Sequence, residues 1–146
     1  MLIHDGLEHQ FTGGNLMPLV KISLRKGRSP EYKKAIRDGV HAALVEAFLI
    51  PDSDRHQVVH ELDPDCFDIP PQNSTQYVVI EVIAFIGRSF EAKKKLYAAI
   101  VDNLTRSPGI PRDDILIILQ EPPTENWGIH GGRPANEVNV GFKIDV

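Results

Sequence analysis

The sequence contains an internal repeat whose two copies are offset by sixty residues. Gly27-Arg28-Ser29 aligns without a gap with Gly87-Arg88-Ser89. Further pairs at the same offset are Glu31 with Glu91, Lys33-Lys34 with Lys93-Lys94, Leu44 with Leu104, Ile50-Pro51 with Ile110-Pro111, Asp54 with Asp114, and Glu61 with Glu121. A period kept through turn, helix and strand indicates one supersecondary unit used twice. Chance similarity between two amphipathic helices would not explain turn residues shared at one fixed offset.

Each copy has the pattern of a strand, a helix and a second strand. Residues 18–24 alternate between apolar and polar side chains, which is typical of a half-buried strand. Ser29 is a favourable N-cap and Pro30 suits the first helical position, so we expect a helix from there to about Phe48. A second strand is expected to begin at Gln57.

The second copy contains the most apolar run of the chain, Tyr77 to Ile86. Its β-branched content favours a central strand that is covered on both faces. Two βαβ units, at about 18–62 and 77–122, can combine through right-handed crossovers into one four-stranded mixed sheet with both helices on one face. We therefore predict an α+β fold, an α/β sandwich built from a tandem βαβ repeat.

A sheet of this kind leaves one apolar face without a layer of helices. We expect self-association to cover that face, because large exposed apolar patches are rare in monomers. Residues 138–146 alternate strictly between apolar and polar side chains, which predicts a C-terminal strand. Such a strand needs a neighbour, and we expect to find it in another subunit.

The composition limits the compartment and the partners of the protein. The 146 residues suit one domain, assigned to 17–146, after a polar segment, 1–16, that we expect to be a flexible arm. A net charge of −4 gives no electrostatic basis for binding nucleic acid or an anionic membrane, and no apolar run reaches the ~20 residues of a membrane span. Cys66 is the single cysteine, which excludes an internal disulfide and favours a reducing cytoplasm.

Two further patterns suggest a metal or nucleotide site but have a simpler interpretation. His56 and His60 have the spacing of a helical metal pair, yet the repeat assigns them to a strand, and no cysteine or third histidine stands nearby. The glycines at 128, 131 and 132 do not lie between a strand and a helix as in dinucleotide-binding proteins, and we interpret them as a turn. We therefore expect neither a metal nor a cofactor.

The dipeptide Met17-Pro18 suggests a chemically active amine at the head of the first strand. Removal of an initiator Met17 would leave Pro18 with a secondary amine, and even an ordinary α-amino group titrates at about 7.7 to 8. The alternative is structural, because proline is also tolerated as the first residue of a strand. The repeat does not require a proline here, since the equivalent position is Val78.

The order and spacing of five segments resemble the tautomerase superfamily. The segments are MPLVKISL, the Gly-Arg-Ser turn before each helix, IPDSDRHQVV, GRSFEAKKKLY and ENWGIHGG, and together they span Pro18 to about Pro134. The resemblance is strongest to the branch that contains malonate semialdehyde decarboxylase. It implies duplicated βαβ units, a homotrimer, catalysis without a cofactor, and a site between subunits built around an amino-terminal proline.

The resemblance also implies roles for particular residues. Pro18 corresponds to the catalytic proline, Arg88 to an arginine that binds the substrate carboxylate, and Asp54 to an aspartate beside the proline. Trp127 and Ile129 correspond to the apolar wall of the pocket. The decarboxylase pattern has a second arginine two positions before the residue that matches Arg88, and this chain has Ile86 there. Arg133 is a candidate for the missing charge.

The expected activity is keto–enol tautomerisation of a small 2-keto acid, with Pro18 as general base and acid. A lyase that decarboxylates or hydrates a 3-oxo acid is the alternative within the same family. If residues 1–17 are retained, Pro18 is an amide without a basic lone pair, and a non-catalytic trimeric binding protein is expected instead.

Each candidate also has a structural interpretation. Arg28 and Arg88 occupy equivalent turns, and we expect Arg88 to be functional and Arg28 to lie at the surface or in an interface. Asp54 has its equivalent in Asp114, which suggests a shared turn role in addition to any catalytic role. Trp127 would also be explained as a core residue.

Overall fold

The computed structural model describes residues 18–138 and Val146. The predicted arm, 1–16, and the interior of the strand predicted over 138–146 lie outside the described residues. The elements are β1 (Leu19–Arg25), α1 (Pro30–Phe48), β2 (His56–Leu62), β3 (Val78–Ile83), α2 (Phe90–Arg106), β4 (Ile115–Gln120), β5 (Gly128–Ile129) and β6 (Arg133–Pro134).

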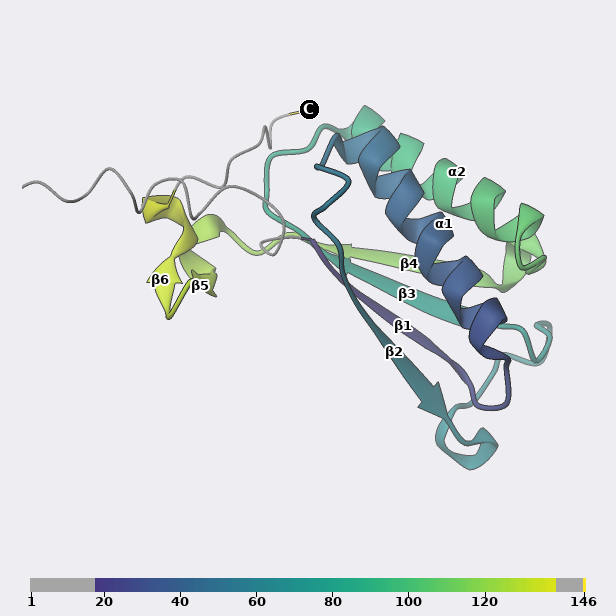
Figure 1. Cartoon of the computed structure of the whole chain (residues 1–146). Coiled ribbons are helices and arrows are strands. Elements are labelled where there is room, and N and C mark those ends of the chain that lie inside the picture. Colours follow the sequence, from purple (N-terminus) through teal and green to yellow (C-terminus); the bar gives the residue numbers. More distant parts are fainter. Residues whose placement is uncertain (1–17, 139–145) are drawn as a thin grey trace, which may run out of the picture.

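The first four strands form one mixed sheet in the order β2-β1-β3-β4, and β5 and β6 form a separate short hairpin. Each βαβ unit contributes a parallel pair, β1 with β2 and β3 with β4, and the two units join through the antiparallel pair β1 and β3. Both helices cover the same face of the sheet (Figure 1). The predicted fold class, a four-stranded mixed sheet with two helices on one face, is confirmed.

The antiparallel pairing relates the two copies by a pseudo-twofold axis. In the register of β1 and β3, Lys21 lies opposite Glu81, which is its equivalent in the repeat. The axis therefore passes between these two residues, and their opposite charges suit a directly facing cross-strand pair. As a consequence, the beginning of β1 lies beside the end of β3, and the beginning of β3 lies beside the end of β1.

The turns that the repeat shares have the same structure in both copies. Ser29 and Ser89 each cap a helix, with the side-chain oxygen accepting from the main-chain N–H of Tyr32 and Ala92, both at 3.1 Å. The cap predicted at Ser29 is confirmed, and Ser89 makes the same cap in the second copy; each satisfies a helix N–H that would otherwise have no intrahelical partner.

An ion pair is also repeated. Lys33 contacts Glu61 at 2.8 Å, and the equivalent Lys93 contacts Glu121 at 2.6 Å. In each copy the pair joins the first turns of the helix to the end of the second strand. The shared lysines and glutamates of the two copies are thus explained by a tertiary contact.

The core lies between the sheet and the helices. Its strand residues are Val20, Ile22, Leu24, Val78, Ile80 and Val82, and its main helix residues are Ile36, Val40, Leu44, Leu96, Ile100 and Leu104. β3 is a central strand, as predicted. In the described part of the chain the helices cover one of its faces, and the opposite face carries the half-buried Val79, Glu81 and Ile83. Neither α1 nor α2 is long and apolar enough to cross a membrane, and the same holds for the rest of the described helices.

Asp114 shows how the fold satisfies a buried carboxylate. The residue is 3% exposed, and its carboxylate accepts hydrogen bonds from Asn73 Nδ2 at 2.9 Å, from the main-chain N–H of Ser74 at 3.1 Å, and from the Ser74 hydroxyl. Burial raises the pKa of the Asp114 carboxyl, but the hydrogen bonds from Ser74 and Asn73 together outweigh burial and bring the pKa below its ordinary value.

Removing this carboxylate is expected to destabilise the fold in a pH-dependent way. Asp114→Ala should lower the free energy of unfolding at pH 7 by about 1.5 to 3 kcal/mol, the range for hydrogen bonds to a charged group. Because the pKa is lower in the folded than in the unfolded chain, the stabilisation is present above the unfolded value of about 3.9 and is lost as the pH falls through the folded value. Denaturant unfolding should therefore show a smaller difference from wild type at pH 3 than at pH 7.

The control for this prediction is Asp113→Ala, because Asp113 is the exposed neighbour of Asp114. Equal losses of stability in the two variants, or a loss that does not depend on pH, would contradict the role assigned to the Asp114 carboxylate.

Candidate functional site

Three of the predicted site residues lie at one end of the sheet. Pro18 is buried and directly precedes β1, whose first residue, Leu19, lies opposite His56 of β2 and Ile83 of β3. Asp54 precedes β2 by two positions, and Arg88 lies in the turn between β3 and α2. The strand register therefore brings the beginning of β1, the beginning of β2 and the end of β3 to the same edge, although these segments are far apart in the sequence.

Arg88 is buried in the turn that precedes α2. It is 6% exposed, its Nη1 donates to the main-chain oxygen of Phe85 at 2.9 Å, and its guanidinium carbon lies 4.7 Å from the centre of the Phe48 ring. An aromatic face stabilises a cation that has lost part of its water. Phe48, the last residue of α1, and Phe85, in the connection between β3 and α2, thus hold the guanidinium in place.

The equivalent arginine, Arg28, lies at the opposite end of the sheet and has a different environment. It is half-buried, its Nη2 donates to the main-chain oxygen of Thr75 at 3.1 Å, and its guanidinium carbon lies 5.1 Å from the centre of the Tyr32 ring. The structure therefore distinguishes two arginines that occupy identical turns in the sequence, because Arg88 is buried and Arg28 is partly in solvent.

Asp54 is the most deeply buried of the charged candidates, with 1% of its surface exposed. Its main-chain N–H donates to the oxygen of Pro51 at 2.9 Å, and the N–H of Asp114 donates to Pro111 at 3.0 Å. The two aspartates therefore occupy equivalent backbone turns, each after the corresponding proline. The two aspartates lie at opposite ends of the sheet, Asp54 just before β2 and Asp114 beside the loop before β3.

An apolar wall stands beside these charged residues. Phe85 is fully buried, and its ring meets the Trp127 ring edge to face with 5.2 Å between centres and 79° between planes. Leu19, Ile129 and Ala135 pack into the same cluster. The wall connects Leu19, which follows Pro18, with Phe85, whose oxygen binds Arg88, so it borders the site on one side.

The wall is held together by the segment that follows β4 (Figure 1). The Trp127 Nε1 donates to the main-chain oxygen of Pro122 at 3.1 Å, and the N–H of Ala135 donates to the oxygen of Trp127 at 3.0 Å. Arg133 lies on β6 opposite Ile129 and is exposed. All six predicted site residues are thus found at this end of the sheet or in the segment that borders it.

Two further features lie in the connection between β3 and α2. Ile86, which stands where the decarboxylase pattern has a second arginine, is 54% exposed. The main-chain N–H of Ser89 donates to the main-chain oxygen of Val146 at 2.6 Å, so an acceptor oxygen is held at the beginning of α2, next to Arg88. An oxygen acceptor at this position is favoured by the partial positive charge of a helix N-terminus.

Phe48 and Phe85 were not predicted as part of the site. Phe85 lies in the apolar run 77–86 and Phe48 ends the apolar face of α1, so neither differs in sequence from an ordinary core residue. His56 and His60 lie on β2 and are exposed, as the strand interpretation predicts. Within residues 18–138, no group of three or more His, Cys, Asp and Glu side chains is arranged to hold a metal ion.

Comparisons with known proteins give a consistent result. Two family models, both described as tautomerase enzymes, match residues 54–130 and 18–72. Probable tautomerase YrdN of Bacillus subtilis (strain 168) is 30% identical over 121 residues, which is 80% of this chain and 94% of the relative. Probable tautomerase YusQ of the same organism is 27% identical over 122 residues, covering 80% and 96% of the two chains.

Solved structures agree with the sequence comparisons. FG41 malonate semialdehyde decarboxylase inhibited by 3-bromopropiolate is 34% identical, with a TM-score of 0.70 over 77% of this chain and 88% of that one. A second malonate semialdehyde decarboxylase is 31% identical, with a TM-score of 0.73 over 80% and 93%. Native fused 4-OT is 20% identical with a TM-score of 0.72 over 82% and 97%, and at this identity the likeness concerns the fold alone.

Proposed function

The chain is an enzyme of the tautomerase superfamily, and from this premise we propose that it interconverts the keto and enol forms of a small 2-keto acid without a cofactor. Pro18 is the proposed general base and acid. The observation that carries the proposal is that Pro18, Asp54 and Arg88, from three distant segments, lie at one end of the sheet beside the wall formed by Phe85 and Trp127.

The proposed chemistry requires a chain that begins at Pro18. Its secondary amine would take a proton from the carbon next to the keto group and return a proton to the oxygen, or carry out the reverse. The buried surroundings of Pro18 would disfavour the protonated amine and so favour its action as a base. Arg88 would bind the substrate carboxylate and stabilise the charge that develops on the oxygen. Asp54 would hold the proton of the amine or orient a water.

The opposite end of the sheet supports these roles. There Arg28 donates to the main-chain oxygen of Thr75, and Asp114 accepts from the main-chain N–H of Ser74. At that end, an arginine binds an acceptor and an aspartate binds a donor, and both partners belong to the loop before β3. In a chain that begins at Pro18, a substrate oxygen and the amine would be the corresponding ligands of Arg88 and Asp54.

Trp127, Ile129 and Arg133 complete the proposed substrate site. Trp127 and Ile129 would exclude water from one side of the substrate, which strengthens its interaction with Arg88. Arg133, on the exposed strand β6, would supply a further positive charge near the entrance.

A lyase that decarboxylates or hydrates a 3-oxo acid is the second candidate, because two similar solved structures are malonate semialdehyde decarboxylases. Ile86 favours the isomerase. Its side chain is 54% exposed and gives no charge to a second carboxylate or carbonyl oxygen, where the decarboxylase pattern has an arginine. Losing one of two cations weakens the hold on a small substrate with two oxygen-bearing groups.

We propose that the enzyme is a homotrimer in the cytoplasm. The face of the sheet opposite the helices carries Val58, Leu116 and Ile118, which are 41%, 42% and 41% exposed. Three exposed apolar side chains on one sheet face favour burial by another subunit. Four of the fused 4-OT structures that share the fold are described as trimers. The exposed thiol of Cys66 suits a reducing compartment.

The amine mechanism predicts a dependence on the residue at the amino terminus. A chain trimmed to begin at Pro18 should accelerate the ketonisation of phenylenolpyruvate, followed by its ultraviolet absorbance. Pro18→Ala in the same trimmed chain should remove most of the acceleration, because it replaces the secondary amine at the reacting position. Equal rates for the two proteins would overturn the mechanism.

Two further measurements separate the alternatives. Release of carbon dioxide from a 3-oxo acid faster than ketonisation would favour the lyase. The intact mass of the natively expressed protein decides whether the amine exists, because a mass that includes residues 1–17 would favour the non-catalytic binding protein.

The two equivalent arginines provide a matched comparison for carboxylate binding. In the trimmed chain, Arg88→Ala should lower kcat/KM roughly tenfold to 150-fold, corresponding to the 1.5 to 3 kcal/mol of a hydrogen bond to a charged group. Arg28→Ala, at the opposite end of the sheet, should leave kcat/KM within about twofold. Similar losses in the two variants would show that the effect of Arg88 is structural.

The trimer is tested by sedimentation. The wild-type protein should have three times the mass of one chain, and Leu116→Lys should shift the equilibrium towards monomers because it introduces a charge on the uncovered face. The control is Ala98→Lys, a similar change at an exposed position of α2. A wild-type monomer would contradict the assembly.

A further inference from the structure

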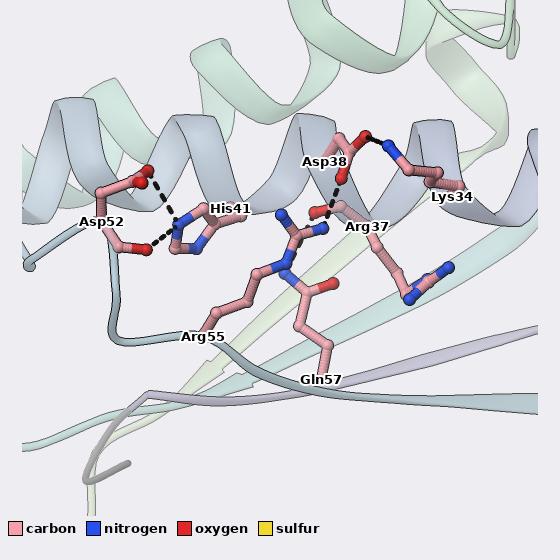
Figure 2. Close-up of polar contacts among 7 residues, drawn as sticks. All are labelled: Lys34, Arg37, Asp38, His41, Asp52, Arg55 and Gln57. Carbon is pink, nitrogen blue, oxygen red and sulfur yellow. Dashed lines mark hydrogen bonds and ion pairs between the residues drawn. The ribbon is translucent and has the colours of Figure 1, made fainter. Parts of the chain in front are cut away.

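The segment that carries Asp54 is tied to helix α1 on both sides of that residue. This segment, 49–55, connects α1 to β2 and contains neither helix nor strand. It begins with Leu49 in the left-handed region, with φ of 55°, which ends the helix abruptly. Figure 2 shows two contacts from the segment to α1, one through Asp52 and one through Arg55.

The first contact is made by His41, a buried residue of α1 that is 5% exposed. Its Nε2 lies 2.8 Å from the main-chain oxygen of Asp52 and 3.3 Å from Asp52 Oδ1 (Figure 2). A carbonyl oxygen only accepts hydrogen bonds, so Nε2 carries the hydrogen and donates it. His41 thus fixes the backbone two residues before Asp54.

The second contact fixes the residue after Asp54. Arg55 Nη2 donates to Asp38 Oδ1, and Asp38 Oδ2 also accepts from Lys34 Nζ at 2.7 Å (Figure 2). The hydrogen bonds from Lys34 and Arg55 lower the pKa of the Asp38 carboxyl, so it remains ionised and paired. Asp54 therefore lies between two backbone positions that are each attached to α1.

The second copy of the repeat has no equivalent of the buried contact. The residue sixty positions after His41 is Val101, and the connection before β4 is tied to α2 by Arg112 and Asp102, at 2.9 Å, with both side chains about 60% exposed. The aspartate in that connection, Asp114, lies at the end of the sheet away from Pro18. The buried histidine is thus found in the copy whose connection carries Asp54.

We infer that His41, together with the ion pair between Asp38 and Arg55, positions the Asp54 carboxylate beside Pro18. The inference rests on the proposed role of Asp54 in the reaction. Holding an irregular segment in one conformation costs conformational entropy, and the contacts of His41 and Arg55 compensate that cost. A catalytic group displaced by about 1 Å can lose roughly a hundredfold in rate, so a buried tether near Asp54 acts on the reaction itself.

The test compares two replacements of His41. Rates are measured in the chain that begins at Pro18, and amide hydrogen exchange is measured in that chain and in the full chain. His41→Leu fills the buried position with an apolar side chain and removes the hydrogen-bond donor. His41→Gln supplies an amide N–H that can reach the same carbonyl oxygen. In His41→Leu, we expect kcat to fall roughly tenfold or more with KM within about twofold, because substrate binding by Arg88 is unaffected. His41→Gln should recover most of the rate.

Amide hydrogen exchange gives a readout that does not depend on activity. The N–H groups of Asp54 and Arg55 donate to Pro51 and Ser53, at 2.9 and 3.1 Å. Their exchange should become at least tenfold faster in His41→Leu and should be near the wild-type rate in His41→Gln. Arg55→Leu removes the exposed ion pair with Asp38 and should also make the exchange at Asp54 faster. This variant replaces His41→Leu in the test if His41→Leu does not fold.

The matched control is Arg112→Ala, which removes the corresponding tether of the second copy and should leave kcat and the exchange of Asp54 unchanged. Unchanged exchange at Asp54 in His41→Leu and Arg55→Leu, or the same loss of kcat in the Leu and Gln variants, would overturn the inference. Failure of the proposed function is seen separately, as equal rates for wild type and Pro18→Ala, and the exchange rates then still decide whether His41 positions Asp54.

Discussion

The antiparallel pairing of β1 with β3 is the contact on which the rest of the structure depends. It joins two βαβ units about a pseudo-twofold axis between Lys21 and Glu81, so the beginning of each unit meets the end of the inner strand of the other. The pairing therefore creates two equivalent ends of the sheet, each with an arginine turn and an aspartate. At one end the loop before β3 binds both Arg28 and Asp114, and at the other end Pro18 begins the first strand.

The two ends of the sheet differ in how their buried charges are stabilised. Taking an arginine or a carboxylate out of water is costly unless hydrogen bonds or opposite charges compensate. Asp114 receives this compensation from Asn73 and Ser74, which gives it a structural role. Arg88 is supported by Phe48 and Phe85, so its guanidinium is held in a fixed place at the end of the sheet where the proposed reaction occurs. A duplicated scaffold thus supplies a structural end and a candidate catalytic end.

Much of the fold was predictable because it depends on local patterns and on one period. The alternation of β1, the two serine caps and the amphipathic faces of α1 and α2 are properties of neighbouring residues, and the sixty-residue offset specified that the unit occurs twice. The family and the six candidate site residues followed from motif order. Phe85 and His41 were not predicted as partners of the site, because a phenylalanine in an apolar run and a histidine on a helix have many ordinary explanations.

The sequence by itself determined the duplicated βαβ architecture and where the two helices begin, since these depend on periodicity and capping along the chain, and its resemblance to known motifs indicated the tautomerase superfamily. Only the tertiary structure decided which of two equivalent arginines is buried, which loop binds the Asp114 carboxylate, and which helix side chains hold the connection around Asp54. The physical reason is that strand register and desolvation are set between segments that are far apart in the chain. Residues that are identical in the repeat acquire different environments only when those segments meet.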